Sequence, residues 1–205
     1  RWDVIYIDET KLPKNKSLQG RTLEEIARIQ GKDPMDVFLD IALEENLETR
    51  FSHVTTQGDP KAACEILKNR FVIVGQSDAG AHMGYDARFG YCTTFLGRWV
   101  RDNGIMSLEE AVSKLTFHVA SIFGLRDRGL LRSGLAADIA VFDPETVNTV
   151  APEYVQDLPG NERRMIQRAT GVHHTVVNGE VVIENGAVTG AYPGRVLRNT
   201  PPPGD

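Results

Sequence analysis

Apolar residues in the first half of the chain recur at helical spacing. Leu23, Ile26 and Ile29 lie three residues apart and directly follow Thr22. Glu25 stands three residues after Thr22, which is the spacing of a capping box, in which each side chain bonds the other residue's backbone N–H. The pattern therefore predicts a helix that begins after Thr22.

The same spacing and similar start signals predict further helices. Asp33-Pro34 opens one of them, because proline is favoured at the first helical position. Ser107 begins another, with Glu110 completing a second capping box. The remaining helices are predicted over Pro60–Leu67, Thr93–Asp102 and His118–Phe123.

Short apolar runs between these helices predict strands. Trp2–Ile7 alternates apolar and polar residues, and Phe51–Thr55 can form a second short strand. Phe71–Val74 is continuously apolar, which is typical of a strand buried on both faces. Only two or three strands thus precede residue 125, too few to close an eight-stranded barrel.

After Arg128 the pattern becomes that of β structure. Leu130–Phe142 holds strand-like runs broken by Gly134, and residues 172–177 and 180–184 flank Asn178-Gly179. Asn-Gly between two alternating runs is the strongest short-range hairpin signal, and Asn185-Gly186 predicts another return.

These elements predict an α/β chain with two parts and a tail. Residues 1–127 form the α/β part, within which 1–50 can be an inserted segment. Residues 128–192 form the β part, and 193–205 are a tail. Alternating helices and buried strands favour a piece of a parallel sheet or barrel.

Composition narrows the function classes. The chain of 205 residues has a formal net charge of −5 and a sequence pI near 5.6, which argues against a general nucleic-acid binder. It contains no apolar run of the roughly 18 residues that span a bilayer, so no membrane role is expected. The N-terminus lacks signal-peptide organisation, and Cys64 and Cys92 form no disulfide framework, so a cytoplasmic setting is the expectation.

The strongest candidate for chemistry is Asp78, in the Gly-rich segment that follows the predicted strand Phe71–Val74. Catalytic groups of barrel enzymes lie at the C-terminal ends of parallel strands, where an aspartate can bind a metal ion or accept a proton. The alternative is an aspartate that caps a turn. His82, four residues later, can touch a substrate or be an ordinary loop residue.

Several motifs in order resemble the D-aminoacylase branch of the amidohydrolases, enzymes that deacylate N-acyl-D-amino acids. These motifs cover nearly the whole chain. They are Gly20-Arg21-Thr22-Leu23, Asp33-Pro34-Met35-Asp36, Ser77-Asp78-Ala79-Gly80, Leu96-Gly97-Arg98-Trp99-Val100-Arg101, Gly124-Leu125-Arg126-Asp127-Arg128-Gly129, Gly134-Leu135-Ala136-Ala137-Asp138 and Val176-Val177-Asn178-Gly179.

The resemblance implies the C-terminal part of a TIM-barrel amidohydrolase joined to part of a small β-sandwich. Asp78 would then be both a ligand of a divalent metal, zinc, and the general base on a metal-activated water. The other metal ligands of the family, beginning with a His-x-His pair, have no counterpart here. The chain is therefore expected to be an incomplete, inactive fragment whose partner is the remaining N-terminal part of the enzyme. The alternative is a non-catalytic structural or binding subunit with this fold.

The implied substrate is a small N-acyl amine or N-acyl amino acid. Family members carry a His-Pro-Arg run whose arginine binds the substrate carboxylate, whereas this chain has Ala87-Arg88-Phe89, with the arginine displaced by one position. Arg88, with His82, is the candidate for substrate binding, and the alternative is a solvated loop arginine. A homo-oligomer is also allowed.

The other histidines have structural interpretations. His53 and His118 are expected at element ends, and His173 and His174 would point to opposite faces of one strand, so they cannot share a metal ion. Both cysteines are expected to be small buried residues.

Overall fold

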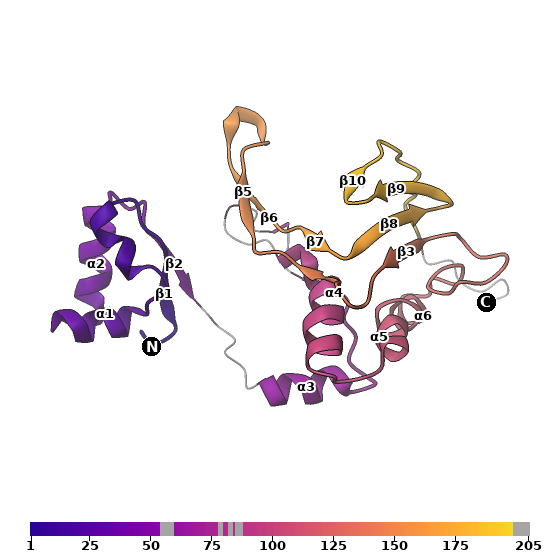
Figure 1. Ribbon diagram of the computed structural model, residues 1–205, viewed down its shortest axis with the longest axis horizontal. Coiled ribbons are helices and arrows are strands. Elements are labelled where there is room, and N and C mark those ends of the chain that lie inside the picture. Colours follow the sequence, from indigo (N-terminus) through magenta and orange to yellow (C-terminus); the bar gives the residue numbers. More distant parts are fainter. Residues whose placement is uncertain (54–59, 78–79, 82–83, 85–87, 199–205) are drawn as a thin grey trace. The chain divides into compact units, whose positions relative to one another are not determined.

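The computed structural model describes every residue except 54–59, 78–79, 82–83, 85–87 and 199–205, and for Arg88 it describes the backbone. The chain divides into two compact units, an N-terminal unit, Arg1–Asp59, and a C-terminal unit, Pro60–Asp205. Figure 1 labels their helices and strands. The boundary predicted at 127/128 lies within the C-terminal unit and stays a prediction about the complete enzyme.

The N-terminal unit pairs two strands and covers them with two helices. Strands β1 (Ile5–Glu9) and β2 (Arg50–His53) are antiparallel, and η1 (Pro13–Leu18), α1 (Leu23–Gln30) and α2 (Pro34–Glu44) lie between them in the chain. The capping box predicted at Thr22 is confirmed, since Thr22 accepts a bond from the Glu25 backbone and Glu25 accepts one from Thr22. Asp33 caps α2 through the Met35 N–H, as predicted.

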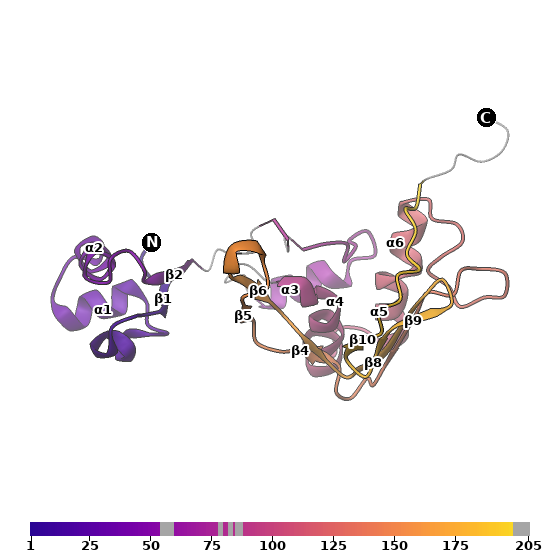
Figure 2. The ribbon, with the colours of Figure 1, turned by 90° about the horizontal axis from the view of Figure 1, so that it is seen from above.

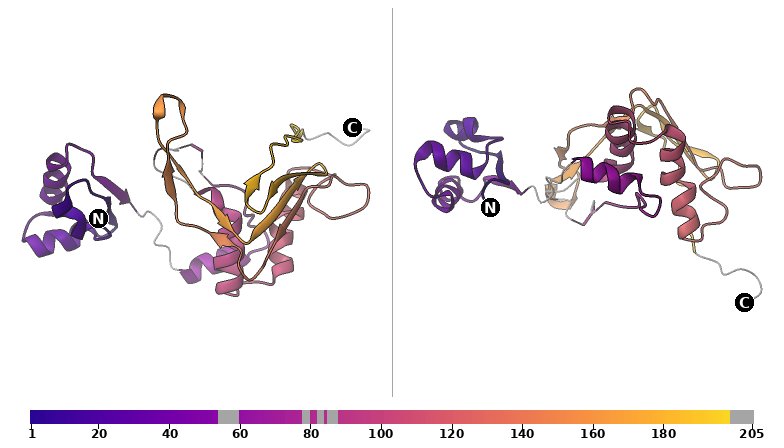
Figure 3. Two further views of the ribbon diagram at one scale, coloured as in Figure 1. Left: turned by 45° about the horizontal axis from the view of Figure 1, so that its top comes forward. Right: turned by 90° about the horizontal axis from the view of Figure 1, so that it is seen from below.

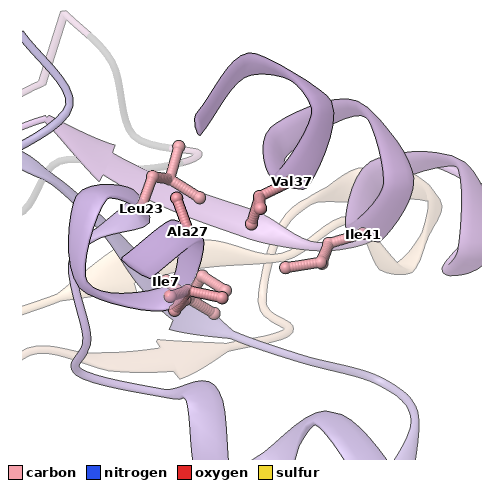
Figure 4. Close-up of a cluster of buried hydrophobic side chains, with 6 residues drawn as sticks. Ile7, Leu23, Ala27, Val37 and Ile41 are labelled. Carbon is pink, nitrogen blue, oxygen red and sulfur yellow. The ribbon is translucent and has the colours of Figure 1, made fainter. Parts of the chain in front are cut away.

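One apolar cluster forms the core of this unit (Figure 4). Its buried members come from β1 and from both helices: Ile7, Leu23, Ile26, Ala27, Val37 and Ile41. Of the three residues whose spacing predicted α1, Leu23 and Ile26 face this core, whereas Ile29 is exposed. Burying a side chain of this kind stabilises a fold by about 1.5–3 kcal/mol, so the cluster dominates the packing energy of the unit.

A buried carboxylate holds the loop after β1. Glu45 is 3% exposed and accepts hydrogen bonds from the Lys11 N–H at 2.9 Å, the Leu12 N–H at 3.0 Å, Asn15 Nδ2 at 2.9 Å and Thr49 Oγ1 at 2.7 Å. Burial alone would raise the pKa of Glu45, but these bonds to its charged form lower the pKa to about 2. The side chain is therefore ionised at neutral pH and joins residues 11–15 to the end of α2.

The C-terminal unit contains a helical layer and a β layer. The helices are α3 (Pro60–Lys68), α4 (Tyr91–Thr94) continuing into the π-helical η3 (Phe95–Asp102), α5 (Leu108–Leu115) and α6 (Phe117–Ile122). These helices lie on one side of the β layer: they are behind the strands in Figure 2, seen from above, and in front of them in the right panel of Figure 3, seen from below. The helix predicted over Thr93–Asp102 is thus present, and so is the capping box at Ser107.

The β layer is antiparallel throughout the described residues. A four-stranded sheet has the order β10-β9-β8-β3, formed by β3 (Ile139–Phe142), β8 (Val172–Val177), β9 (Glu180–Glu184) and β10 (Ala187–Val188). Both predicted Asn-Gly turns are confirmed. Asn178 and Gly179 have φ of 48° and 86°, and Asn185 and Gly186 have φ of 49° and 82°, the left-handed conformations of two-residue hairpin turns.

A long two-stranded arm leaves this sheet between β3 and β8. It consists of β4 (Asn148–Thr149), β5 (Glu153–Val155), η4 (Pro159–Asn161), β6 (Arg164–Ile166) and β7 (Ala169–Thr170), with β4 paired to β7 and β5 to β6. Figure 1 shows its β5–β6 end projecting beyond the helices. Its strands have only two or three residues, too few for the alternation that predicts a strand.

One strand prediction is wrong and another is confirmed only in part. Phe71–Val74 forms no strand, and Phe71 is 79% exposed. A parallel strand is defined by hydrogen bonds to its neighbours, and no described strand lies beside this segment. In Leu130–Phe142 only Ile139–Phe142 is a strand, because only these residues pair with β8.

Candidate functional site

The site residues predicted from sequence fall in a segment of which the structure describes only part. Asp78 and His82 lie outside the described residues. The Arg88 backbone begins the short helix η2 (Arg88–Gly90), while its side chain is not described. The convergence of these three side chains therefore stays a prediction. The described residues around them can be examined for their contacts.

Residues 75–90 are termed here the site segment. Besides the Thr93 hydroxyl, which donates to the nearby Gly90 carbonyl, three side chains of the described part of the chain form hydrogen bonds with this segment. At its start, Tyr91 Oη donates to the Gly75 carbonyl at 3.5 Å. Near its middle, Tyr154 Oη donates to the Gly84 carbonyl at 3.1 Å. At its end, the Gly90 N–H donates to Gln167 Oε1 at 3.1 Å. Two of the three partners, Tyr154 and Gln167, belong to the arm, 60 to 80 residues further along the chain.

The helix that follows the site segment is fixed by close packing on strand β4. A Cβ added at Gly90 would lie 1.9 Å from the Thr149 methyl carbon, and one added at Gly97 would lie 2.4 Å from the Val147 carbonyl oxygen. Thr94 and Thr149 share a hydrogen bond of 2.9 Å between their hydroxyls. The two glycines therefore allow α4 and η3 to approach the arm more closely than any other residue would.

The apolar side of this helix completes the second core. Phe95, Leu96 and Val100 are buried, and Val74 and Phe142 pack against the same cluster. The Asn103 N–H bonds to the Arg98 carbonyl at 3.2 Å, a five-residue step that marks π-helical winding. Gly84 and Gly90 are thus hydrogen-bonded to the arm, and Gly90 leads directly into a well-packed helix.

Two described ionisable groups beside the site segment, Tyr91 and Cys92, are held in their protonated forms. Burial raises the pKa of the Cys92 thiol, so the thiol is protonated at neutral pH and is a poor nucleophile. Burial also raises the pKa of Tyr91, whose hydroxyl therefore remains a hydrogen-bond donor. Cys92 and Cys64, both predicted to be small buried residues, are only partly buried.

No described part of the chain forms a metal site. Within the described ranges, no three His, Cys, Asp or Glu side chains lie close enough together to hold a metal ion. His173 and His174 occupy successive positions of β8, as predicted, and His53 ends β2. Among the residues that can be placed, none of the helices has the length and apolarity needed to cross a membrane.

Sequence reasoning missed the residues that hold the site segment. Gln167, Tyr154 and Thr149 belong to no motif, and each lies more than 50 residues from its partner in the chain. The one local signal was glycine at positions 90 and 97, where absence of a side chain permits close approach.

Comparison with known proteins identifies the family. The amidohydrolase family model Amidohydro_3 matches residues 12–183. The D-aminoacylase of Alcaligenes xylosoxydans xylosoxydans is 32% identical over 194 residues, which are 89% of this chain and 35% of that protein. The N-acyl-D-glutamate deacylase of the same organism is 40% identical over 110 residues, 54% of this chain and 20% of that one.

Solved structures agree with these matches. A mutant D-aminoacylase in complex with CuCl2 has a TM-score of 0.58 and 32% identity, covering 94% of this chain and 37% of that chain. The N-acyl-D-glutamate deacylase of Bordetella bronchiseptica, complexed with zinc and a phosphonate inhibitor, has a TM-score of 0.57 and 29% identity, covering 96% and 38%. The chain thus spans little more than a third of the length of these proteins. It belongs to the amidohydrolase family, in the branch that resembles D-aminoacylase.

Proposed function

We propose that the protein containing this chain hydrolyses the amide bond of N-acyl amino acids, with Asp78 as general base. The observation that carries the proposal is the likeness to D-aminoacylase over 89% of the chain, which includes the Ser77-Asp78-Ala79-Gly80 motif. Relatives that match shorter stretches include N-acyl-D-glutamate and N-acyl-D-aspartate deacylases. The substrate class follows from these names by analogy.

A divalent metal ion, zinc by preference, is the cofactor of this proposal. Such an ion lowers the pKa of a bound water and polarises the scissile carbonyl. By resemblance to the family, Asp78 is the ligand that this chain contributes. A structural or catalytic zinc site takes three or four protein ligands, and the others would come from outside this chain.

Asp78 performs the proton transfers in this scheme. Its carboxylate accepts a proton from the attacking water while the new C–O bond forms. It then returns that proton to the amine as the C–N bond breaks. The products are a carboxylic acid and an amine-bearing compound. General-base catalysis of this kind accelerates a reaction by about 10²- to 10⁴-fold.

Arg88 and His82 are the proposed substrate-binding residues. A guanidinium offers two parallel N–H donors to a carboxylate, which suits the free carboxylate of an N-acyl amino acid. His82 shares the site segment and can donate to the same group. The position of Arg88, two residues before the anchored Gly90, supports a role at the end of this segment.

By the same reasoning the 205-residue chain alone is inactive. One aspartate leaves a metal ion with too few protein ligands. In this proposal the chain, taken alone, is a non-catalytic portion of the amidohydrolase fold.

The experiment is a substrate panel assayed with the full-length enzyme. N-acetyl-D-glutamate, N-acetyl-D-leucine, their L enantiomers and an N-acetylated amine without a carboxylate are incubated before and after chelation, and again after zinc is restored. We expect hydrolysis of at least one D substrate that is lost on chelation and recovered with zinc. Activity unaffected by chelation, or no hydrolysis of any amide, would contradict the proposal.

A further inference from the structure

Two Asn-Gly turns of the four-stranded sheet have the same backbone conformation but different surroundings. Asn178-Gly179 joins β8 to β9, and Asn185-Gly186 joins β9 to β10, with positive φ at all four residues. An asparagine followed by glycine is chemically labile, because glycine has no side chain to keep its backbone nitrogen away from the asparagine amide carbon. How firmly each turn holds these two groups therefore decides whether it can react.

In the first turn both groups are engaged. Asn178 Oδ1 accepts a hydrogen bond from Arg128 Nη2 at 2.9 Å, and Asn178 Nδ2 donates to the Pro193 carbonyl at 2.7 Å. The Gly179 N–H donates to the Ala137 carbonyl at 2.9 Å. Asn178 is half-buried, so breaking these bonds is costly. The side chain and the nitrogen that would attack it are thus both fixed.

In the second turn neither group is engaged. Asn185 and Gly186 are exposed, and within the part of the chain that the structure describes neither the Asn185 side chain nor the Gly186 N–H forms a hydrogen bond. The Asn185 N–H donates to the His173 carbonyl at 2.6 Å, which fixes the chain before the turn. The side-chain amide and the nitrogen that follows it remain free to move.

The second turn also opens at a lower cost. For the Gly186 nitrogen to reach the Asn185 amide carbon, the turn must leave its hairpin conformation. β10 has two residues, both exposed, and lies at the end of the described strand order (Figure 1). Beyond it the Thr189 N–H donates to the Val182 carbonyl at 3.1 Å, so such an opening stays local. Opening at Asn178 instead separates β8 from β9 inside the sheet, which costs more free energy.

We propose that Asn185 is a site of spontaneous deamidation, and that the contacts of Asn178 protect the equivalent turn. The Gly186 nitrogen loses its proton to a base in solution and attacks the Asn185 amide carbon, which forms a succinimide ring and expels ammonia. Water then adds to either ring carbonyl and breaks its bond to the nitrogen, leaving aspartate or isoaspartate. One water is consumed and one ammonia is released, with no oxidation or reduction. This inference does not depend on the proposed function.

Either product changes the edge of the sheet. A carboxylate at position 185 adjoins Glu184, so the modification adds a second negative charge there at neutral pH. Isoaspartate also routes the main chain through the former side chain and adds a carbon atom to it, which shifts the register that pairs Ala187 with Glu184. The β9–β10 pairing is therefore lost in the isoaspartate form.

The first test follows both turns in full-length enzyme during incubation in mildly alkaline buffer. The same enzyme unfolded in guanidinium chloride is the reference, and mass spectrometry of proteolytic peptides measures the amide-to-acid change at each position. We expect Asn185 to convert at least about tenfold faster than Asn178 in the folded enzyme, and the two rates to differ by less than about threefold in the unfolded enzyme. Equal rates in the folded enzyme, or no conversion of Asn185 while the unfolded enzyme reacts, would overturn the proposal.

The second test removes one contact of the protected turn. Arg128→Lys keeps the charge that faces Asp138 but loses the planar fork that reaches Asn178. Conversion at Asn178 should rise at least about threefold, whereas Arg126→Lys, at an exposed arginine, should leave it at the wild-type rate. Asn185→Gln should abolish the mass change at the second turn, because the longer side chain forms the ring far more slowly. A mass change that persists there, or an Asn178 rate that Arg128→Lys leaves unchanged, contradicts the proposal. If melting curves show that Arg128→Lys does not fold, the comparison of folded and unfolded wild type decides.

Discussion

Replacing Glu45 with glutamine tests how the N-terminal unit is held together. Each carboxylate oxygen accepts two hydrogen bonds, Oε1 from Leu12 and Asn15 and Oε2 from Lys11 and Thr49. Glutamine has one oxygen, so its NH2 group would face two donors. The substitution loses two bonds to a charged group, each of which contributes about 1.5–3 kcal/mol. We expect the free energy of unfolding of this unit to fall by about 3–5 kcal/mol.

The same carboxylate makes the stability depend on pH. Its pKa falls from an ordinary 4.5 to about 2 on folding, so the unfolded chain binds the proton more tightly. The stabilisation, about 3 kcal/mol, is present above pH 4.5 and declines as the pH falls toward 2. Because Glu45→Gln has no carboxylate at this position, the stability gap between it and wild type should narrow by about 2 kcal/mol between pH 7 and pH 3.

Urea unfolding followed by Trp2 fluorescence measures this effect, since Trp2 packs against the core of the unit. Both proteins carry Trp99→Phe, because Trp99 belongs to the other unit and would add a second signal. The control is Glu48→Gln, an exposed position that should change stability by less than about 0.5 kcal/mol. A Glu45→Gln protein as stable as this control, or a gap that stays constant in acid, would refute the reasoning.

Three further predictions concern the C-terminal unit and the enzyme. Gly90→Ala should lower the free energy of unfolding of this unit by about 1–3 kcal/mol, measured in urea through Trp99 fluorescence. Adding Thr149→Ser removes the methyl group 1.9 Å from the new Cβ and should restore at least half of the lost stability. A double variant no more stable than Gly90→Ala contradicts this prediction. In full-length enzyme, Arg88→Ala should lower kcat/KM for an N-acyl amino acid by the equivalent of about 2 kcal/mol or more. It should have little effect on kcat/KM for the same substrate with its carboxylate replaced by a neutral amide. An equal loss on both substrates would mean that Arg88 has a structural role. The dialysed 205-residue chain should retain no stoichiometric zinc by metal analysis, and one tightly held zinc per chain would be the contrary result.

Local signals in the sequence were sufficient for the elements that depend on their own residues. The capping boxes at Thr22 and Ser107 and the Asn-Gly turn at Asn178 are formed within four residues, so their patterns predicted them. The buried face of α1 followed from spacing in part, since Leu23 and Ile26 are buried and Ile29 is exposed.

Elements that depend on distant partners could not be predicted in this way. Phe71–Val74 has the composition of a buried strand, but no described strand pairs with it. The arm's strands are defined by pairing alone, and Gln167 reaches Gly90 across 77 residues of chain. Nothing near Gln167 in the sequence marks it as a partner of the site segment.

The most direct test of the central claim is the turnover of Asp78→Asn in full-length enzyme, on the substrate that the panel identifies. Asparagine keeps the shape of the side chain but cannot accept the proton of the attacking water. We expect kcat to fall by at least about 10²- to 10⁴-fold, while Asp36→Asn, at an exposed aspartate of α2, keeps wild-type activity. Hydrolysis by Asp78→Asn within a few-fold of wild type would contradict the assignment of Asp78 as the general base.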